Sequence, residues 1–250
     1  NNTLVRDNYG IYLINSRHVN ISNNIINSSS ANQSAIYLQR SINNTIISNL
    51  INTSSVNNLG IYLSDRADNN TIMYNNINTS EIAAFGMFIS DSLFNNISSN
   101  TIKTVGVDAV GFYLVNGTNY TSFTGNKIFT IGSGAYGVYF DWNFGKNGDT
   151  MNNTISFNTI NTSDEGIRVI MARNITIINN IVNTSSNDGI SAQYSEYINI
   201  SRNNITTLYS IGTPILLMTN YSTITSNIID VLTSGSGGLG AIHLKSPSYN

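Results

Sequence analysis

One arrangement of apolar and polar residues recurs from the first residues of the chain almost to its last. An isoleucine is followed three positions later by asparagine and five positions later by another apolar residue, as in Ile72, Asn75 and Ile77. A second motif keeps the same period of about 25 residues: a small residue precedes an apolar-x-apolar run, as from Gly60 to Leu63. A fixed period of this length predicts a solenoid or another repeat array.

The pattern within each repeat indicates strands and turns. Apolar residues alternate in short runs, and Asn, Ser, Thr and Gly bound these runs. No segment keeps the i, i+3, i+4, i+7 pattern of a helix over several turns, which argues against helical repeats. Two or three short strands in about 25 residues favour a parallel β-helix, and crossovers between parallel strands are nearly always right-handed. We therefore predict an all-β fold, a single-stranded right-handed parallel β-helix of about ten coils.

The whole chain, residues 1–250, reads as a single β-helix domain. The repeat motif begins in mid-coil near Asn2, and no capping segment is visible at either end. Because solenoids need caps over their terminal strands, we expect a fragment, or a unit of a longer repeat protein or filament.

The recurrent asparagine predicts an internal ladder. Stacked in register, each carboxamide can donate to the oxygen or the backbone of its neighbour. Asparagine also tolerates the left-handed backbone of a sharp corner. The nine residues expected to point inward are Asn24, Asn49, Asn75, Asn100, Asn126, Asn158, Asn180, Asn203 and Asn227.

A column of aromatic residues should lie on the outside. The residue two positions after each small residue alternates away from the core, and in six coils it is aromatic: Tyr12, Tyr37, Tyr62, Phe88, Tyr113 and Tyr139. The column then continues with Arg168 and His243, separated by Ser191 and Leu216. Two interpretations stay open: cross-strand stacking that stabilises the sheet, or a contact with a neighbouring subunit or a glycan.

An insertion interrupts coil six. Residues 141–154 depart from the repeat and contain the only tryptophan, Trp142, together with Asp141 and Asp149. Insertions in solenoids form loops, and loops carry function. Trp142 could present a platform for a sugar ring or a partner, or it could fold back against the rod.

Register also brings charged residues together. Glu165 and Asp188 each precede a glycine, so they should stack near Arg168. Asp65 and Asp91 should stack likewise, with Arg40 one coil earlier, either as a solvated turn relieved by Arg40 or as a pair able to share a cation.

Composition narrows the classes of function. The 250 residues include no cysteine, 10% are charged, and the net charge is −2, which argues against a nucleic-acid surface. No apolar run is long enough to span a bilayer. The two histidines, His18 and His243, fall in coils at opposite ends of the rod. We predict no catalytic residue, no metal site and no cofactor.

Asn-x-Ser/Thr sequons are dense, which a chain so rich in these residues also produces by chance. If the protein is secreted, we expect glycans only on exposed turn asparagines. The candidates are Asn32, Asn52, Asn78, Asn116 and Asn183.

The repeats from Asn2 to Leu244 resemble the parallel β-helix repeats of the NosD-like and carbohydrate-binding and sugar-hydrolase superfamily, especially asparagine-rich archaeal cell-surface forms. The resemblance implies the fold, whereas the scaffold serves adhesins, surface layers, lyases, epimerases and hydrolases alike. The paired aspartates and Gly-His-Gly of polygalacturonases are absent, as is the Asp-Pro-His-Asp motif of alginate epimerases.

Two functional hypotheses follow. The first is a non-enzymatic, extracellular or cell-surface rod of a filament, surface layer or adhesin that self-associates end to end or side by side. The alternative is a carbohydrate-binding or polysaccharide-modifying module with its site around Trp142, Asp141, Asp149 and Glu165.

Overall fold

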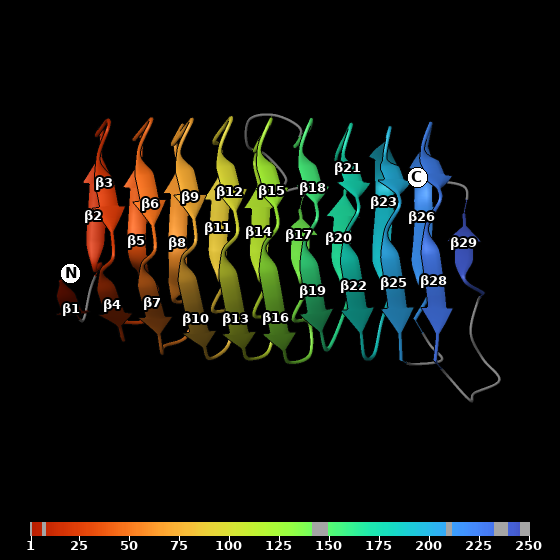
Figure 1. The fold of residues 1–250 in the computed structure, drawn as a ribbon, viewed down its shortest axis with the longest axis horizontal. Coiled ribbons are helices and arrows are strands. Elements are labelled where there is room, and N and C mark those ends of the chain that lie inside the picture. Colours follow the sequence, from red (N-terminus) through yellow and green to blue (C-terminus); the bar gives the residue numbers. More distant parts are fainter. Residues whose placement is uncertain (1, 7–8, 142–149, 209–211, 233–239, 246–250) are drawn as a thin grey trace.

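The computed structural model describes residues 2–6, 9–141, 150–208, 212–232 and 240–245. Over these residues the chain winds into a straight rod of stacked coils, with three strands in almost every coil (Figure 1). The strands form three sheets of ten, ten and nine strands, and each strand pairs in parallel with its counterparts in the adjacent coils. The predicted parallel β-helix is confirmed.

The first sheet contains β1 (Thr3–Arg6), β4 (Ile25–Ser28), β7 (Leu50–Thr53), β10 (Asn76–Ser80), β13 (Thr101–Val105), β16 (Lys127–Ile131), β19 (Thr159–Thr162), β22 (Ile181–Thr184), β25 (Asn204–Thr207) and β28 (Ile228–Val231). The second sheet contains β2 (Ile11–Ile14), β5 (Ser34–Gln39), β8 (Leu59–Ser64), β11 (Met87–Ser90), β14 (Phe112–Val115), β17 (Val138–Phe140), β20 (Ile167–Ile170), β23 (Ile190–Glu196), β26 (Ile215–Asn220) and β29 (Ile242–Leu244). The third sheet contains β3 (Asn20–Ser22), β6 (Thr45–Ile47), β9 (Thr71–Met73), β12 (Asn96–Ser98), β15 (Ser122–Thr124), β18 (Thr154–Ser156), β21 (Thr176–Ile178), β24 (Asn199–Ser201) and β27 (Thr223–Thr225).

The core is a set of apolar columns along the rod axis. Ile46, Ile72 and Ile97 are paired in register in the third sheet and are fully buried. Because side chains alternate across a strand, every second residue enters this core while its neighbours face outward. Phe112 and Phe123 fill the middle coils with rings 5.0 Å apart.

The asparagine ladder is confirmed, and its amides run continuously along one corner of the rod. Asn100 donates from Nδ2 to the Oδ1 of Asn126 at 3.0 Å and to the carbonyl of Ile72 at 2.9 Å, while its own Oδ1 accepts from the backbone and side chain of Asn75. Eight of the nine residues are buried, and Asn227 near the C-terminal end is half-buried. The ladder therefore satisfies backbone groups that the corner would otherwise leave unpaired inside the protein.

A second, shorter ladder precedes the third sheet, and the sequence analysis did not recognise it. Asn44 donates from Nδ2 to the Oδ1 of Asn70, which donates in turn to the Oδ1 of Asn95 at 3.2 Å. Asn153 serves the same corner by accepting from the backbone of Thr121. The signal was present in three of these coils as Asn-Asn-Thr-Ile, whose second asparagine directly precedes the strand, as Asn70 precedes Thr71.

Several corners of the coil hold a residue in the left-handed region of the backbone, and two of these corners bound the third sheet. We call the corner before the third sheet the first corner column; its φ angles lie between 50° and 57°, and its members are His18, Asn43, Asn69, Phe94, Tyr120, Asn152, Asn174, Tyr197 and Tyr221. The second corner column follows the third sheet and comprises Asn23, Ser48, Tyr74, Ser99, Gly125, Phe157, Asn179, Arg202 and Ser226. Asparagine and glycine suit this conformation, whereas bulky aromatic residues rarely adopt it.

The junction between the first two sheets requires small residues. A Cβ on Gly60 would lie 2.4 Å from the carbonyl oxygen of Gly86 and 2.4 Å from the Cγ2 of Ile77. The same crowding surrounds Gly86, Gly111 and Gly137. The glycine at this position in seven of the ten second-sheet strands therefore lets adjacent coils approach.

The predicted glycan acceptors divide into two kinds. Asn32 and Asn116 lie in turns, with φ of 59° and 51°. The prediction that the other three lie in turns was wrong: Asn52, Asn78 and Asn183 lie within first-sheet strands. They face outward, and each donates its amide to the asparagine one coil earlier, as Asn78 does to Asn52 at 3.0 Å.

Within the described ranges no helix has the length and hydropathy needed to cross a membrane.

Candidate functional site

The outer face of the second sheet carries the aromatic column in the predicted order. Successive members are paired one coil apart, from Tyr12 opposite Tyr37 to Tyr113 opposite Tyr139. Adjacent ring centroids are 4.5–5.2 Å apart, and Tyr37 lies almost parallel to Tyr62. Tyr12 is 42% exposed and the others are half-buried, so the column presents ring edges and hydroxyls more than ring faces.

Aromatic residues directly before the glycine column widen this face, and the sequence analysis missed them. The Tyr136 ring lies 5.1 Å from Tyr139 and the Phe85 ring 5.0 Å from Tyr113, both edge-on. In the sequence, each of these aromatic residues stands three positions before a member of the aromatic column. Tyr9, Phe85 and Tyr136 therefore flank the aromatic column in three of its six coils.

The phenol groups act as hydrogen-bond donors. Tyr113 donates to the Oδ2 of Asp141 at 2.6 Å, and the hydroxyls of Tyr37 and Ser64 lie 2.9 Å apart. Burial, followed by the charge of neighbouring groups, raises the pKa of Tyr62 to about 12. Burial, followed by the hydrogen bond to Asp141, also raises the pKa of Tyr113. These phenols stay protonated at neutral pH and are not bases there.

Arg168 ends the aromatic column. It follows Tyr139 in register, and its guanidinium carbon lies 5.7 Å from the Tyr139 ring centroid and 5.3 Å from that of Tyr136. This is cation–π geometry. Burial disfavours the charged guanidinium, but Glu165 and the two phenols hold the pKa of Arg168 above its ordinary value. A permanent cation therefore stands where the aromatic column gives way to polar residues.

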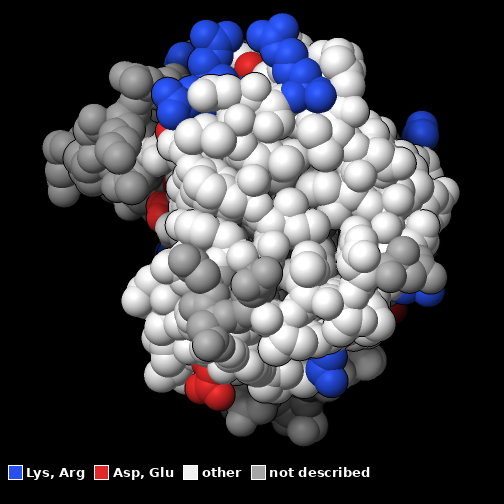
Figure 2. Space-filling model, turned by 90° about the vertical axis from the view of Figure 1, so that its left-hand side faces the viewer, with Lys and Arg blue, Asp and Glu red and all other residues white. Residues whose placement is uncertain are grey.

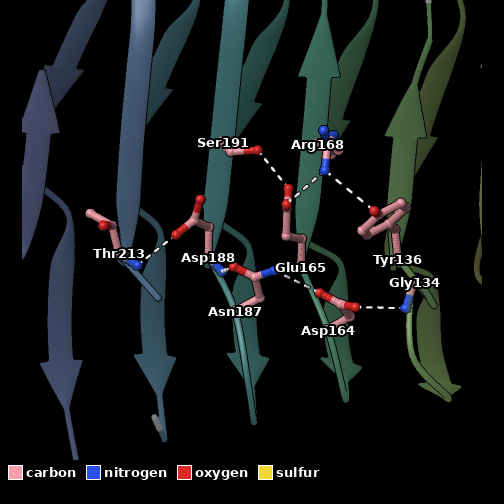
Figure 3. A network of polar contacts seen from close by, with 9 residues as sticks. All are labelled: Gly134, Tyr136, Asp164, Glu165, Arg168, Asn187, Asp188, Ser191 and Thr213. Carbon is pink, nitrogen blue, oxygen red and sulfur yellow. Dashed lines mark hydrogen bonds and ion pairs between the residues drawn. The ribbon is translucent and has the colours of Figure 1, made fainter. Parts of the chain in front are cut away.

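Glu165 fixes the position of this cation (Figure 3). Its Oε1 accepts from Nη1 of Arg168 at 2.8 Å and its Oε2 accepts from the Ser191 hydroxyl at 2.7 Å. Glu165 is 4% exposed, and burial raises its pKa even though Ser191 and Arg168 stabilise the carboxylate. With both oxygens occupied, Glu165 positions Arg168 instead of offering itself to a ligand.

The neighbouring acids extend the network along the coils. Asp164 accepts from the backbone of Gly134 at 2.6 Å and from the Asn187 amide at 3.0 Å. Asp188 lies one coil after Glu165, as predicted, and accepts from the backbone of Thr213 at 2.6 Å. Burial raises the pKa of Asp188 although the Thr213 amide and Arg168 act against the shift. Within the described residues Arg168 forms an ion pair with Glu165 and none with Asp188.

Among the described residues, no protein group accepts from Nε or Nη2 of Arg168. Its hydrogen bonds, to Glu165 and Tyr136, both start from Nη1. Among the described residues its buried Nε has no partner, and 24% of the side chain is exposed. A planar guanidinium with free donors suits a carboxylate, sulfate or phosphate group.

The predicted insertion site is only partly described. Asp141 lies at the edge of the second-sheet face and binds Tyr113, whereas Trp142 and Asp149 lie outside the described residues. Glu165 and Arg168 come together as expected. His18 and His243 lie in the first coil and in the last coil described.

Asp65 and Asp91 meet at a turn beyond the second sheet, in an open depression of about 550 Å³ also lined by Arg17, Arg40 and Arg66. Basic side chains gather at this edge of the rod in the end-on view (Figure 2). Arg40 lies in the same depression as the two acids, but no described ion pair joins it to either carboxylate, and the Gln39 amide donates to Asp65 at 2.6 Å. Burial, followed by the charge of Asp65, raises the pKa of Asp91.

Comparison with known proteins agrees with this architecture. Residues 1–147 match the family model described as the right-handed β-helix region. The chain belongs to the right-handed β-helix family. Residues 121–243 of this β-helix protein also match the model described as periplasmic copper-binding protein (NosD). No curated protein is significantly similar to it in sequence.

Solved structures share the fold of this β-helix protein at low identity. A double mutant of the periplasmic alginate epimerase AlgG is 11% identical with a TM-score of 0.55, over 92% of this chain and 70% of that one. A DFA-IIIase from Arthrobacter chlorophenolicus A6, in complex with DFA-III, is 11% identical with a TM-score of 0.62, over 88% of this chain. The chain spans 61% of that DFA-IIIase. At this identity the likeness establishes the fold alone.

The described residues bring together no histidine or cysteine ligands for the copper named in the NosD description. Copper sites use His, Cys and Met ligands. The β-helix protein has no cysteine and two histidines, and these lie at opposite ends of the rod. In the part of the chain that the structure describes, no group of three or more His, Cys, Asp or Glu side chains could hold a metal ion.

Proposed function

We propose that this β-helix protein acts outside the cytoplasm as a carbohydrate-binding module whose second-sheet face binds an acidic polysaccharide. The single observation that carries the proposal is the placement of Arg168 at the end of the aromatic column. Its guanidinium is held by Glu165 and the Tyr136 hydroxyl through Nη1, and among the described residues no protein group accepts from Nη2. A sugar carboxylate or sulfate would complete its hydrogen bonds, while the oxygens of the phenol row would accept from hydroxyls along the polymer.

Similar proteins support the class of ligand and the location. The alginate epimerase and the DFA-IIIase are named for carbohydrate activities, and both share the β-helix fold of this chain. NosD is described as periplasmic, and so is the alginate epimerase. An extracellular, cell-surface or periplasmic protein would meet polysaccharides there.

Binding of acidic and neutral polymers tests this function. Affinity electrophoresis in gels containing alginate or polygalacturonate should retard the wild-type chain, and retardation should weaken as salt rises. Arg168→Gln should lower the affinity about tenfold to a hundredfold, because a charge-assisted hydrogen bond contributes roughly 1.5–3 kcal/mol. Arg202→Gln is the matched control, since Arg202 is an exposed arginine of the second corner column.

The melting temperature of Arg168→Gln must be measured alongside, because the change leaves Glu165 buried without its cation. Pairing it with Glu165→Gln restores a neutral site. A folded double variant that binds acidic polymers as tightly as the wild type would refute the proposal, as would a wild-type chain that binds none.

A modifying enzyme is the second candidate, favoured by Asp141. Its carboxylate accepts from Tyr113 at 2.6 Å at the edge of the same face, where it could reach a bound sugar. Incubation of alginate and polygalacturonate with the chain, followed by product analysis, tests this role. Turnover that disappears in Asp141→Asn would support it, and turnover that persists there would exclude this residue.

A structural rod is a third proposal. The rings of Tyr12, Tyr37 and Tyr62 stack face to face on one another, so their faces are covered by neighbouring rings. Such a column stabilises the sheet and could also contact a second copy side by side. Sedimentation of the wild type and Tyr62→Ser over a concentration series tests it: self-association that weakens in the variant supports a lateral contact.

A further inference from the structure

The first corner column carries exposed aromatic residues that the fold does not require. Phe94, Tyr120, Tyr197 and Tyr221 have φ angles of 52–57° and are 50–74% exposed. At the equivalent corners of other coils the residue is Asn43, Asn69, Asn152 or Asn174. Asparagine is the residue this backbone favours, and a bulky side chain there is a conformational outlier. Tyr74 and Phe157 of the second corner column share this backbone, so what distinguishes the four residues of the first corner column is that their rings stack in pairs.

These four residues form two stacked pairs. The rings of Phe94 and Tyr120 are 4.8 Å apart with planes 13° from parallel, and those of Tyr197 and Tyr221 are 5.2 Å apart and 14° from parallel. The centroid distances match the spacing of adjacent coils, so the rings stack along the rod axis. The unstacked face of Tyr120 is therefore turned toward the second pair, and that of Tyr197 toward the first.

Two asparagines lie between the pairs. Backbone hydrogen bonds place the corners of Tyr120, Asn152, Asn174 and Tyr197 in successive coils. Three coil steps put the inner rings about 14 Å apart. The two amide side chains are shorter than the aromatic side chains on either side of them, and Asn174 donates to the Oδ1 of Asn152 at 2.6 Å. Among the described residues the Nδ2 of Asn152 and the Oδ1 of Asn174 have no hydrogen-bond partner.

The positive charge next to these two asparagines is compensated by an ion pair. Arg173 precedes Asn174 and forms an ion pair with Glu196 at 2.7 Å. Aromatic rings on both sides of amide donors and acceptors match a sugar, which presents apolar C–H faces and polar hydroxyl edges. We propose that the corner from Phe94 to Tyr221 is a second binding site, one that takes a neutral glycan chain of several sugar rings. The proposal is independent of the second-sheet face, which offers a cation instead.

Substitution by the asparagine of neighbouring coils separates function from fold. The test variant is Tyr120→Asn combined with Tyr197→Asn, and the matched control is Tyr74→Asn combined with Phe157→Asn. Tyr74 and Phe157 lie in the second corner column with similar φ, are 61% and 62% exposed, and stack on no ring among the described residues. Both variants are produced in a host without N-glycosylation, because the changes at Tyr120 and Phe157 create sequons.

Affinity electrophoresis with soluble β-glucan, mannan and xylan, together with thermal melts, gives the readout. We expect the wild type to bind at least one of these neutral polymers, the test variant to bind it at least tenfold more weakly with an unchanged or higher melting temperature, and the control variant to bind as the wild type does. Arg168→Gln should leave this binding unchanged, so failure at one site is distinguishable from failure at the other.

Three results would overturn the inference. The wild type could bind none of the neutral polymers. The test variant could bind as tightly as the wild type. Sedimentation could show that the four rings join two copies of the chain, with a dimer that disappears in the test variant and no glycan retardation.

Discussion

At the scale of single residues, the ladder asparagines should each contribute measurably to stability. Asn100→Ala would leave the backbone N–H of Asn75 and the carbonyl of Ile72 buried without their partners. Unpaired buried groups of this kind cost about 1–3 kcal/mol, so urea denaturation should show a loss of that size. Asn52→Ala removes an outward, half-buried amide and should cost less. Equal stability of Asn100→Ala and the wild type would contradict the role of the ladder.

The buried acids beside Arg168 should make stability depend on pH. Burial raises the pKa of both Glu165 and Asp188 in the folded protein, so between their unfolded and folded values the native state binds more protons than the unfolded chain. The free energy of unfolding should therefore fall as pH rises from about 4 through this range. Asp188→Asn keeps an acceptor for Thr213 and should flatten that fall, as measured by thermal melts at several pH values. An unaltered pH profile in Asp188→Asn would show that Asp188 contributes nothing to it.

At the scale of the coil, two corners differ in the residues that they accept. One corner has no room for a side chain, whereas the other has room and a left-handed backbone that asparagine tolerates. Gly60→Ala would bring a Cβ within 2.4 Å of the Gly86 carbonyl, a backbone atom that yields only if the coils shift. Overpacking of this kind costs typically about 1–3 kcal/mol. Gly125→Asn is the control: its φ is 66°, its Cβ would be 3.7 Å from the Ser99 hydroxyl, and asparagine occupies equivalent corners. The control should melt no lower than the wild type, while Gly60→Ala melts lower.

At the scale of the whole molecule, each coil contacts mainly its two neighbours, so the rod should tolerate the loss of one complete repeat. Deleting residues 86–110 joins Phe85 to Gly111. Gly111 occupies the same position in its coil as Gly86 does in the deleted one. The shortened chain should fold, unfold cooperatively and scatter as a rod shorter by about 4.8 Å. Deleting residues 86–97 instead removes part of a coil and should prevent folding. If the full-repeat deletion failed while other repeats could be removed, the fourth coil would have a role beyond stacking.

The sequence by itself determined the coil, the direction of each side chain and the internal ladder. These follow from periodicity: strands alternate side chains with a period of two, and in-register stacking places equivalent residues of successive repeats one above another. For that reason periodicity alone placed Tyr12 to Tyr139 on one outer column and Asn24 to Asn203 inside, and the strand register and the burial of these residues agree.

The tertiary structure decided what depends on contacts between columns and on the exact positions of corners. Tyr136 meets Arg168 and Ser191 meets Glu165 because side chains reach from one coil to the next, which a column-by-column analysis does not follow. The corners were misplaced for Asn52 and Asn78, since Asn and Thr serve equally on an outer strand and in a turn. Tyr120 and Tyr197 occur in coils whose lengths differ, so their common corner and left-handed backbone are defined only by the hydrogen bonds between stacked coils.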